Sequence, residues 1–207
     1  MSEAATTNHN WGIRAKSYHL RTRIPPFSWV YEAEKNALQN LLLPFKNFHF
    51  QRALDLGTGR GDSLPILLSL SQTISAIDLS DEMLRYAKET YQADQPERIS
   101  FHHADAASIP FDDSYFDLVF SIGLAEYFQN PKILLNEIRR VSKPQAVVIL
   151  TLSPENFGNR LRKLWGTPIY FHSHVNFSEF AMTLGFNILD SSKLYSQHIF
   201  ALQLEKK

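Results

Sequence analysis

Residues 53–62, ALDLGTGRGD, constrain the fold of this chain more than any other stretch of its sequence. An apolar run ends at Asp55, and glycines then occupy the alternate positions Gly57, Gly59 and Gly61 before a leucine-rich segment. This order predicts a buried strand, a tight turn and the start of a helix. Glycine reaches positive φ values without strain and leaves room for a ligand against the backbone. The segment therefore predicts a ligand-binding turn, although similar turns also close ordinary connections between strands and helices.

Strand and helix patterns alternate along the rest of the chain. Strand patterns occur at residues 52–56, 73–77, 98–102, 116–121, 146–152, 186–190 and 198–204. Helical patterns occur at residues 28–43, 63–69, 81–91, 132–141 and 177–184.

The arrangement of these strands follows from two of them. The run at 146–152 is apolar throughout, which is typical of a strand buried on both faces in the middle of a parallel sheet. The link between the last two strands is too short for a parallel crossover, so that pair should be antiparallel. We expect an α/β fold with a doubly wound, seven-stranded, mostly parallel sheet and one antiparallel strand near the C-terminus.

Length and composition limit the domain organisation and the partners. A chain of 207 residues with 44% hydrophobic content can bury one substantial core, so residues 51–207 should form one main domain and residues 1–50 a helical extension. Basic and acidic residues both number 21, which gives no net charge to attract nucleic acid. No apolar stretch approaches the roughly 20 residues that span a bilayer, and cysteine is absent. We expect a cytoplasmic protein without a membrane span, monomeric or homodimeric.

Three carboxylates lie at the ends of successive predicted strands or shortly after them. Asp55, Asp78 and Asp105 should meet at the edge of the sheet where parallel strands end and ligands bind. Asp78 lies 23 residues after Asp55, close to the spacing at which an acid reaches a ribose diol in such folds. Each acid alone could equally cap a helix, but together with the glycine turn they favour a ligand site.

The position after the glycine turn limits the ligand further. The dinucleotide fingerprint G-x-G-x-x-G would need glycine at position 62, which is Asp62. An acid at the start of a helix repels pyrophosphate. A ligand with a ribose but no phosphate therefore fits better.

Four segments together resemble the class I S-adenosylmethionine-dependent methyltransferases. They are ALDLGTGRGD, IDLS at 77–80, HADAASIPFDDSYFDLVFSIGLAEYF at 103–128 and LLNEIRRVSKPQAVVILTLSPEN at 134–156. The resemblance covers roughly residues 50 to 204 and is strongest to the broad group with small-molecule and ubiquinone or menaquinone pathway enzymes. It implies S-adenosylmethionine as cofactor. One departure is Pro144-Gln145-Ala146, where the group commonly has Pro-Gly-Gly.

The resemblance also implies ten cofactor-binding residues at the ends of four strands. They are Asp55, Gly57, Thr58, Gly59, Asp78, Leu79, Met83, Asp105, Ala106 and Ser121. Asp55 and the turn backbone would hold the methionine part, and Asp78 would bind both ribose hydroxyls. Leu79 and Met83 would pack near the adenine, and Asp105 would accept from its amino group.

The substrate side is less defined by the sequence. Methyl transfer needs a base only if the acceptor must lose a proton, and we take Tyr127, His172 and Tyr18 as the candidate catalytic residues, with Glu126 and His174 among further candidates. For each histidine a surface or structural role is the competing interpretation. We expect no metal site, because the His172-Ser-His174 pair has no nearby acid or thiol.

Residues 153–174 should cover the pocket as a lid. Residues 156–174 are basic and aromatic without an acidic residue, including Arg160 and Arg162. We expect a small-molecule acceptor with an aromatic or lipid-like body and an anionic group, although such a run could also be a solvated basic face. The alternatives are an RNA- or protein-directed methyltransferase and a non-catalytic S-adenosylmethionine-binding protein. Zero net charge and a missing accessory domain disfavour a nucleic-acid substrate.

Overall fold

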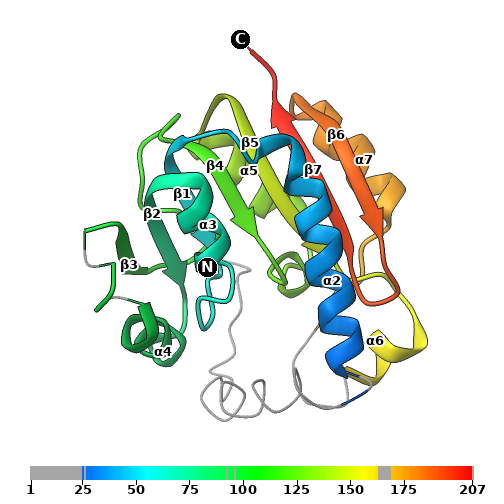
Figure 1. Ribbon diagram of the computed structural model, residues 1–207. Coiled ribbons are helices and arrows are strands. Elements are labelled where there is room, and N and C mark those ends of the chain that lie inside the picture. Colours follow the sequence, from blue (N-terminus) through cyan, green and yellow to red (C-terminus); the bar gives the residue numbers. More distant parts are fainter. Residues whose placement is uncertain (1–24, 26, 92, 96, 163–168, 207) are drawn as a thin grey trace.

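The centre of the protein is a seven-stranded sheet (Figure 1). The structure is a computed structural model, and it describes residues 25, 27–91, 93–95, 97–162 and 169–206. Its strands are β1 (Phe50–Leu56), β2 (Ser71–Asp78), β3 (Ile99–His103), β4 (Phe116–Ser121), β5 (Ser142–Leu152), β6 (Phe186–Lys193) and β7 (His198–Leu204). Their order across the sheet is β3-β2-β1-β4-β5-β7-β6. The first five strands in this order are parallel, and β7 is antiparallel to both β5 and β6. The predicted doubly wound sheet with one antiparallel strand is confirmed.

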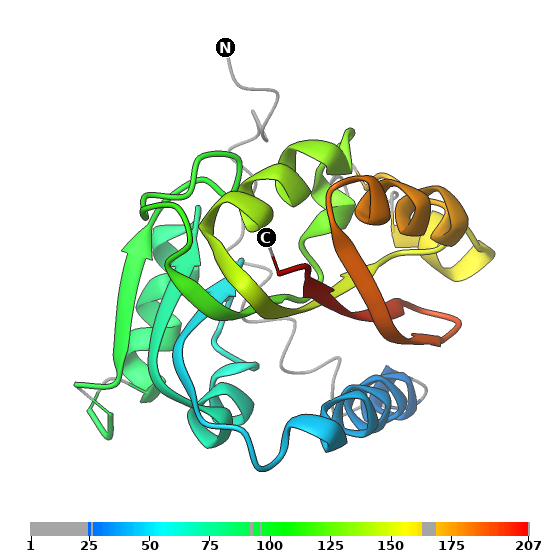
Figure 2. The same cartoon turned by 90° about the horizontal axis from the view of Figure 1, so that it is seen from above.

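Helices cover both faces of the sheet. They are α2 (Phe27–Leu42), α3 (Leu64–Leu70), α4 (Asp81–Tyr91), α5 (Pro131–Val141), α6 (Phe157–Arg162) and α7 (His174–Thr183), with the 3-10 turns η1 (Leu43–Phe45) and η2 (Ala125–Tyr127). Figure 2 shows α2 and α3 on one face and α5 and α7 on the other. None of the helices in the described ranges is long and apolar enough to cross a membrane.

The two faces carry separate hydrophobic cores. One core joins α5 and α7 to the sheet through residues such as Ile138 and Phe177, and the other joins α2 and α3 through residues such as Leu41 and Leu67. Successive residues of β5 alternate between the two cores, and every residue from 146 to 152 is buried. This confirms that the most apolar strand is buried on both faces.

Several predicted boundaries were wrong. No helix was predicted between residues 153 and 173, but this region contains α6, and α7 begins at His174 instead of 177. β5 begins at Ser142, which pairs with Phe116, and Gln145 has a φ of 66°. These segments hold few apolar residues in a regular period, so pattern analysis does not detect them. The division of the chain at residue 51 stays a prediction, although Leu41 and Leu42 of α2 are part of the core.

Candidate functional site

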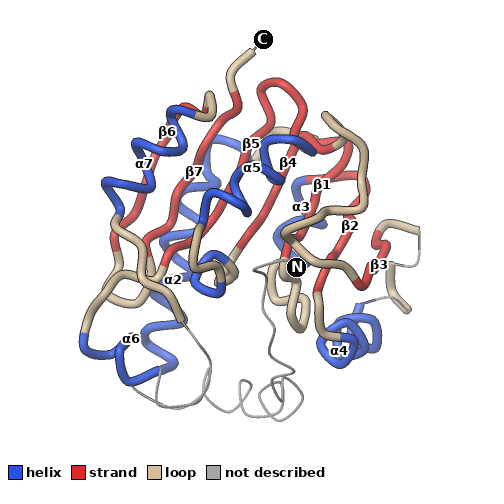
Figure 3. Tube along the Cα trace, turned by 180° about the vertical axis from the view of Figure 1, so that it is seen from behind, coloured by secondary structure: helices blue, strands red, loops and turns tan. Residues whose placement is uncertain are grey.

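The predicted ligand residues gather at the edge where the parallel strands end. The register pairs Asp55 of β1 with Ala76 of β2 and with Phe120 of β4, so Asp55, Asp78 and Ser121 come at similar heights. Figure 3 shows the loops at this edge, beside α4 and α6. Parallel pairing therefore brings residues from distant parts of the sequence into one site.

The glycine turn is held by backbone hydrogen bonds to β2. The N–H groups of Gly57 and Thr58 both donate to the carbonyl of Ile77, each at 2.9 Å. Gly57, Gly59 and Gly61 all have positive φ, between 53° and 85°. The turn therefore needs glycine for its backbone conformation, as the sequence predicted.

Spaces around the three glycines differ in a way that indicates where a ligand fits. A Cβ on Gly61 would lie 2.8 Å from side-chain atoms of Leu64 and Tyr91, and a Cβ on Gly57 would lie 3.0 Å from Leu124. A Cβ on Gly59 would have no heavy atom of the described residues within 4 Å, its two chain neighbours aside. Among the described residues, nothing therefore blocks access of a ligand to the Gly59 backbone from this side.

Asp55 is a buried acid at the end of β1. Its side chain is 1% exposed and accepts a 2.6 Å hydrogen bond from the Thr58 hydroxyl. Burial, with a smaller contribution from the negative charge of Asp78, raises the pKa of Asp55 to about 7, although the Thr58 hydrogen bond opposes this shift. A ligand cation near this carboxylate would favour its ionised form.

Asp78 links the second strand to the glycine turn. Its carboxylate accepts from the N–H of Gly59 at 2.8 Å and from the N–H of Ser80 at 2.9 Å. Burial raises the pKa of Asp78, against the effect of these donors. The neighbouring Leu79 is half exposed, and the N–H of Met83 donates to the Ser80 hydroxyl in the first turn of α4.

Asp105 starts a tight turn after β3. Its Oδ1 accepts from the N–H of Ala107 at 2.8 Å, and its carbonyl accepts from the N–H of Ser108 at 3.0 Å. Ala106 between them is 8% exposed. These bonds fix the orientation of the carboxylate and of the adjacent backbone.

Ser121 closes β4 with an unusual hydroxyl. Its side chain is fully buried, and Oγ has no hydrogen-bond partner within the part of the chain that the structure describes. A buried hydroxyl without a partner is costly. A polar ligand atom at the strand ends would remove this cost.

The substrate-side candidates are only partly brought together. Tyr127 lies in η2, and Nε2 of His172 lies 3.0 Å from the carbonyl of Phe128 next to it. The N–H of Tyr170 donates to the carbonyl of Glu126, so residues 169–172 are bound to η2. Burial lowers the pKa of His172. Tyr18 lies outside the described residues.

The predicted lid is described only in part. Residues 163–168 and the side chain of Arg162 lie outside the description, and Arg160 forms an exposed ion pair with Glu155 at 2.8 Å. Among the described residues no group of three or more potential metal ligands occurs.

Two sets of polar contacts were not predicted, although Glu126 itself was among the candidate bases. Glu126 is 2% exposed and accepts a hydrogen bond from the Ser153 hydroxyl. Glu137 and Arg140 of α5 bind the loop after β3, as described below. Glu137 and Arg140 are opposite charges at i, i+3 spacing in a predicted helix, and this spacing indicates an ion pair. It does not show which loop the ion pair contacts.

Comparisons with known proteins agree with this geometry. Residues 54–150 match a family model described as a methyltransferase domain. The chain is similar to the demethylmenaquinone methyltransferase of Clavibacter sepedonicus, with 37% identity over 48% of this chain and 40% of that protein. It is also similar to the malonyl-[acyl-carrier protein] O-methyltransferase of Marinomonas sp. (strain MWYL1), with 31% identity over 74% of this chain and 59% of that protein. The chain spans about half the length of these curated relatives.

A solved structure shows the same fold. The magnesium protoporphyrin IX methyltransferase of Synechocystis PCC 6803, determined with bound SAH, has a TM-score of 0.68 and 16% identity. The match covers 84% of this chain and 83% of the other.

Proposed function

Because the chain belongs to the class I methyltransferases, we propose that it binds S-adenosylmethionine at the carboxyl edge of its sheet and transfers the methyl group to a small-molecule acceptor. The observation that carries this proposal is the environment of Gly59. Its backbone donates to Asp78, and no other described residue beyond its chain neighbours lies within 4 Å of the position that a Cβ would take. That arrangement leaves room for the ribose side of a ligand against the backbone.

The described residues fit this cofactor chemically. Asp55 and Asp78 place two carboxylates beside the turn, which suits a ligand with positive charge and ribose hydroxyls and no phosphate. The Ser121 hydroxyl supplies a buried polar atom that a ligand would satisfy. Asp105 and the backbone of Ala106 offer an acceptor and a donor to an adenine.

The cofactor supplies an activated methyl group on its sulfonium, so the protein needs only to bind, align and exclude water. Alignment of two reactants can contribute about 7 to 11 kcal/mol of the barrier. A Cβ on Gly57 would lie 3.0 Å from the Leu124 side chain, so η2, which begins after Leu124, lies beside the turn. Tyr127 of η2 and His172, whose ring lies against the Phe128 carbonyl, are therefore our proposed acceptor-side residues.

For the acceptor we propose an aromatic or lipid-like molecule with an anionic group. The basic and aromatic composition of residues 156–174 supports this proposal. The two curated relatives are named for a demethylmenaquinone and for a malonyl-[acyl-carrier protein], and neither name fixes the acceptor here.

Titration calorimetry with S-adenosylmethionine tests the first step. We expect binding by the wild type and at least tenfold weaker binding by Asp78→Asn, because the ribose would lose an ionised acceptor. Asp94→Asn, on the exposed surface, is the control and should bind like the wild type. Absence of binding by the wild type would contradict the proposal.

Transfer of a labelled methyl group tests the second step. The enzyme is incubated with labelled cofactor and with separate metabolite, lipid, protein and RNA fractions. We expect label in the metabolite or lipid fraction. Label only in protein or RNA would support a macromolecular acceptor, and cofactor binding without transfer to any fraction would support a non-catalytic role.

A further inference from the structure

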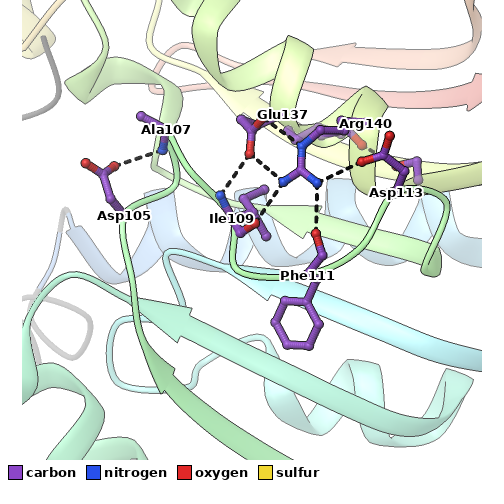
Figure 4. A network of polar contacts seen from close by, with 9 residues as sticks. Asp105, Ala107, Ile109, Phe111, Asp113, Glu137 and Arg140 are labelled. Atoms are coloured by element: carbon purple, nitrogen blue, oxygen red, sulfur yellow. Dashed lines mark hydrogen bonds and ion pairs between the residues drawn. The ribbon is translucent and has the colours of Figure 1, made fainter. Parts of the chain in front are cut away.

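Two charged side chains of α5 hold the loop that follows β3 (Figure 4). Glu137 accepts from the N–H of Ile109 at 2.8 Å. Arg140 donates to the carbonyls of Ile109 and Phe111, each at 2.8 Å, and to Asp113 at 3.0 Å. The two side chains are also paired with each other at 2.8 Å. Both polar backbone groups of Ile109 are thus fixed by one ion pair.

This ion pair is stronger than an exposed surface pair. Only 32% of the Arg140 side chain and 19% of the Glu137 side chain are exposed. The hydrogen bond from Arg140 lowers the pKa of Glu137, and the pKa of Arg140 is raised mainly by Glu137 and then by Asp113. Charge-assisted hydrogen bonds with limited exposure hold a loop more firmly than neutral ones.

The clamped residues follow Asp105 through a continuous chain of turns. Asp105 bonds to the N–H groups of Ala107 and Ser108, and Ile109 comes next. Only three residues, 106 to 108, therefore lie between Asp105 and the clamped Ile109. Figure 4 shows Asp105 and Ala107 at one end of this path and Glu137 and Arg140 at the other.

We infer that Glu137 and Arg140 are positioning residues for base recognition, because they hold the backbone that sets the place of Asp105 and Ala106. The inference rests on the proposed function. In this proposal, Glu137 and Arg140 of α5 help the site to distinguish adenine from a base that lacks the amino group. The ion pair itself does not touch the ligand.

A neighbouring arginine provides a matched control. Arg139 donates from Nε to the carbonyl of Leu184 at 2.8 Å, at the end of α7, and so contacts a different part of the molecule from the same helix. A change at Arg139 tests the effect of losing a comparable contact without moving the loop after β3.

Binding of S-adenosylhomocysteine and of S-inosylhomocysteine by calorimetry tests the inference. The second ligand has a carbonyl in place of the adenine amino group. We expect the wild type to prefer adenine by roughly 5- to 150-fold, the range for one unpaired polar group. Glu137→Gln and Arg140→Lys should weaken the binding of S-adenosylhomocysteine and should change the affinity for S-inosylhomocysteine by no more than about twofold. The preference for adenine therefore falls.

The possible outcomes separate the inference from its premise. No binding of S-adenosylhomocysteine by the wild type overturns the proposed function. If both variants keep the wild-type preference for S-adenosylhomocysteine, the inference is overturned. It is also overturned if both ligands lose affinity to the same extent, which is the result that general destabilisation produces. A preference lost in Glu137→Gln and Arg140→Lys and kept in Arg139→Lys supports it, with circular dichroism confirming that all variants are folded.

Discussion

Asp55 is the residue whose chemistry depends most on its surroundings. An aspartate in water is ionised at neutral pH, but the buried carboxylate has a pKa of about 7. Near neutrality it is therefore partly protonated until a cation arrives. The Thr58 hydroxyl is the nearest group that favours its ionised form.

We predict that cofactor affinity rises as pH increases from 5.5 to 7.5. A protonated Asp55 gives no attraction to a cationic ligand, and ionisation through a pKa of about 7 restores that attraction. The gain can reach at most tenfold per pH unit below the pKa. Calorimetry across this pH range measures the slope.

Two variants control this prediction. Asp55→Asn should remove the slope, because no group then titrates at this position. Thr58→Val should shift the rise to higher pH, since the carboxylate loses its hydroxyl donor. An equal slope in the wild type and in Asp55→Asn would rule out Asp55 as the titrating group.

At the scale of elements, α7 meets the sheet through two histidines. His174 at the start of α7 and His198 at the start of β7 have ring centroids 5.4 Å apart. His174 also packs on Phe200, at 4.5 Å between ring centroids. Burial lowers the pKa of both histidines below the ordinary value of 6.5, and Lys193 contributes to both shifts.

We predict that acid destabilises the protein through this contact. The folded-state pKa values are lowered, so the unfolded chain takes up protons first as pH falls below about 6.5. The free energy of unfolding should be unaffected by these histidines above that pH and should fall below it. Urea unfolding at pH 7.5, 6.0 and 5.0 measures the change.

The variant with His174→Gln and His198→Gln removes both titrating rings. Its loss of stability between pH 7.5 and 5.0 should be smaller than that of the wild type, whatever its stability at pH 7.5. Equal losses in the two proteins would show that other groups cause the acid sensitivity.

α5 shows how far local sequence predicts an element. Asn130 and Pro131 are a typical helix cap and first-turn proline, and the Asn130 side chain accepts from the N–H of Lys132 at 3.1 Å. α6 was missed because it is short and Phe157 at its start is exposed, so no apolar face marks it. Helices with a buried stripe were predictable, and those held by loop contacts were not.

The whole molecule is one sheet with two cores that share its strands. Ile138 belongs to the core under α5, and Ile149 belongs to the core on the opposite face. Both side chains are fully buried. Because β5 contributes to both cores, loss of either core should disturb the same sheet.

We predict that Ile138→Val and Ile149→Val each lower the free energy of unfolding by about 0.5 to 1.5 kcal/mol. The two changes should add in the double variant, because they lie on opposite faces. Urea unfolding followed by circular dichroism and fluorescence should give one transition in every case. Val30→Ala, at a position that is 39% exposed, should change stability by less than about 0.5 kcal/mol. Separate transitions for the two cores would contradict the prediction.

The sequence alone determined the features that depend on neighbours in the chain. Glycines at 57, 59 and 61 determined a turn with positive φ, and acids at or near the ends of three strands determined a row of carboxylates at one edge. The alternation of strands and helices also determined the sheet, since parallel strands must pair with their carboxyl ends together.

Only the tertiary structure decided which distant groups meet. It placed Leu124 against Gly57, left the Ser121 hydroxyl buried without a partner among the described residues, and joined Arg140 to the loop after β3. It also decided the pKa of Asp55, because burial depends on every element packed around the strand end. Such contacts arise from packing across long separations in sequence, and local patterns carry no information about their geometry.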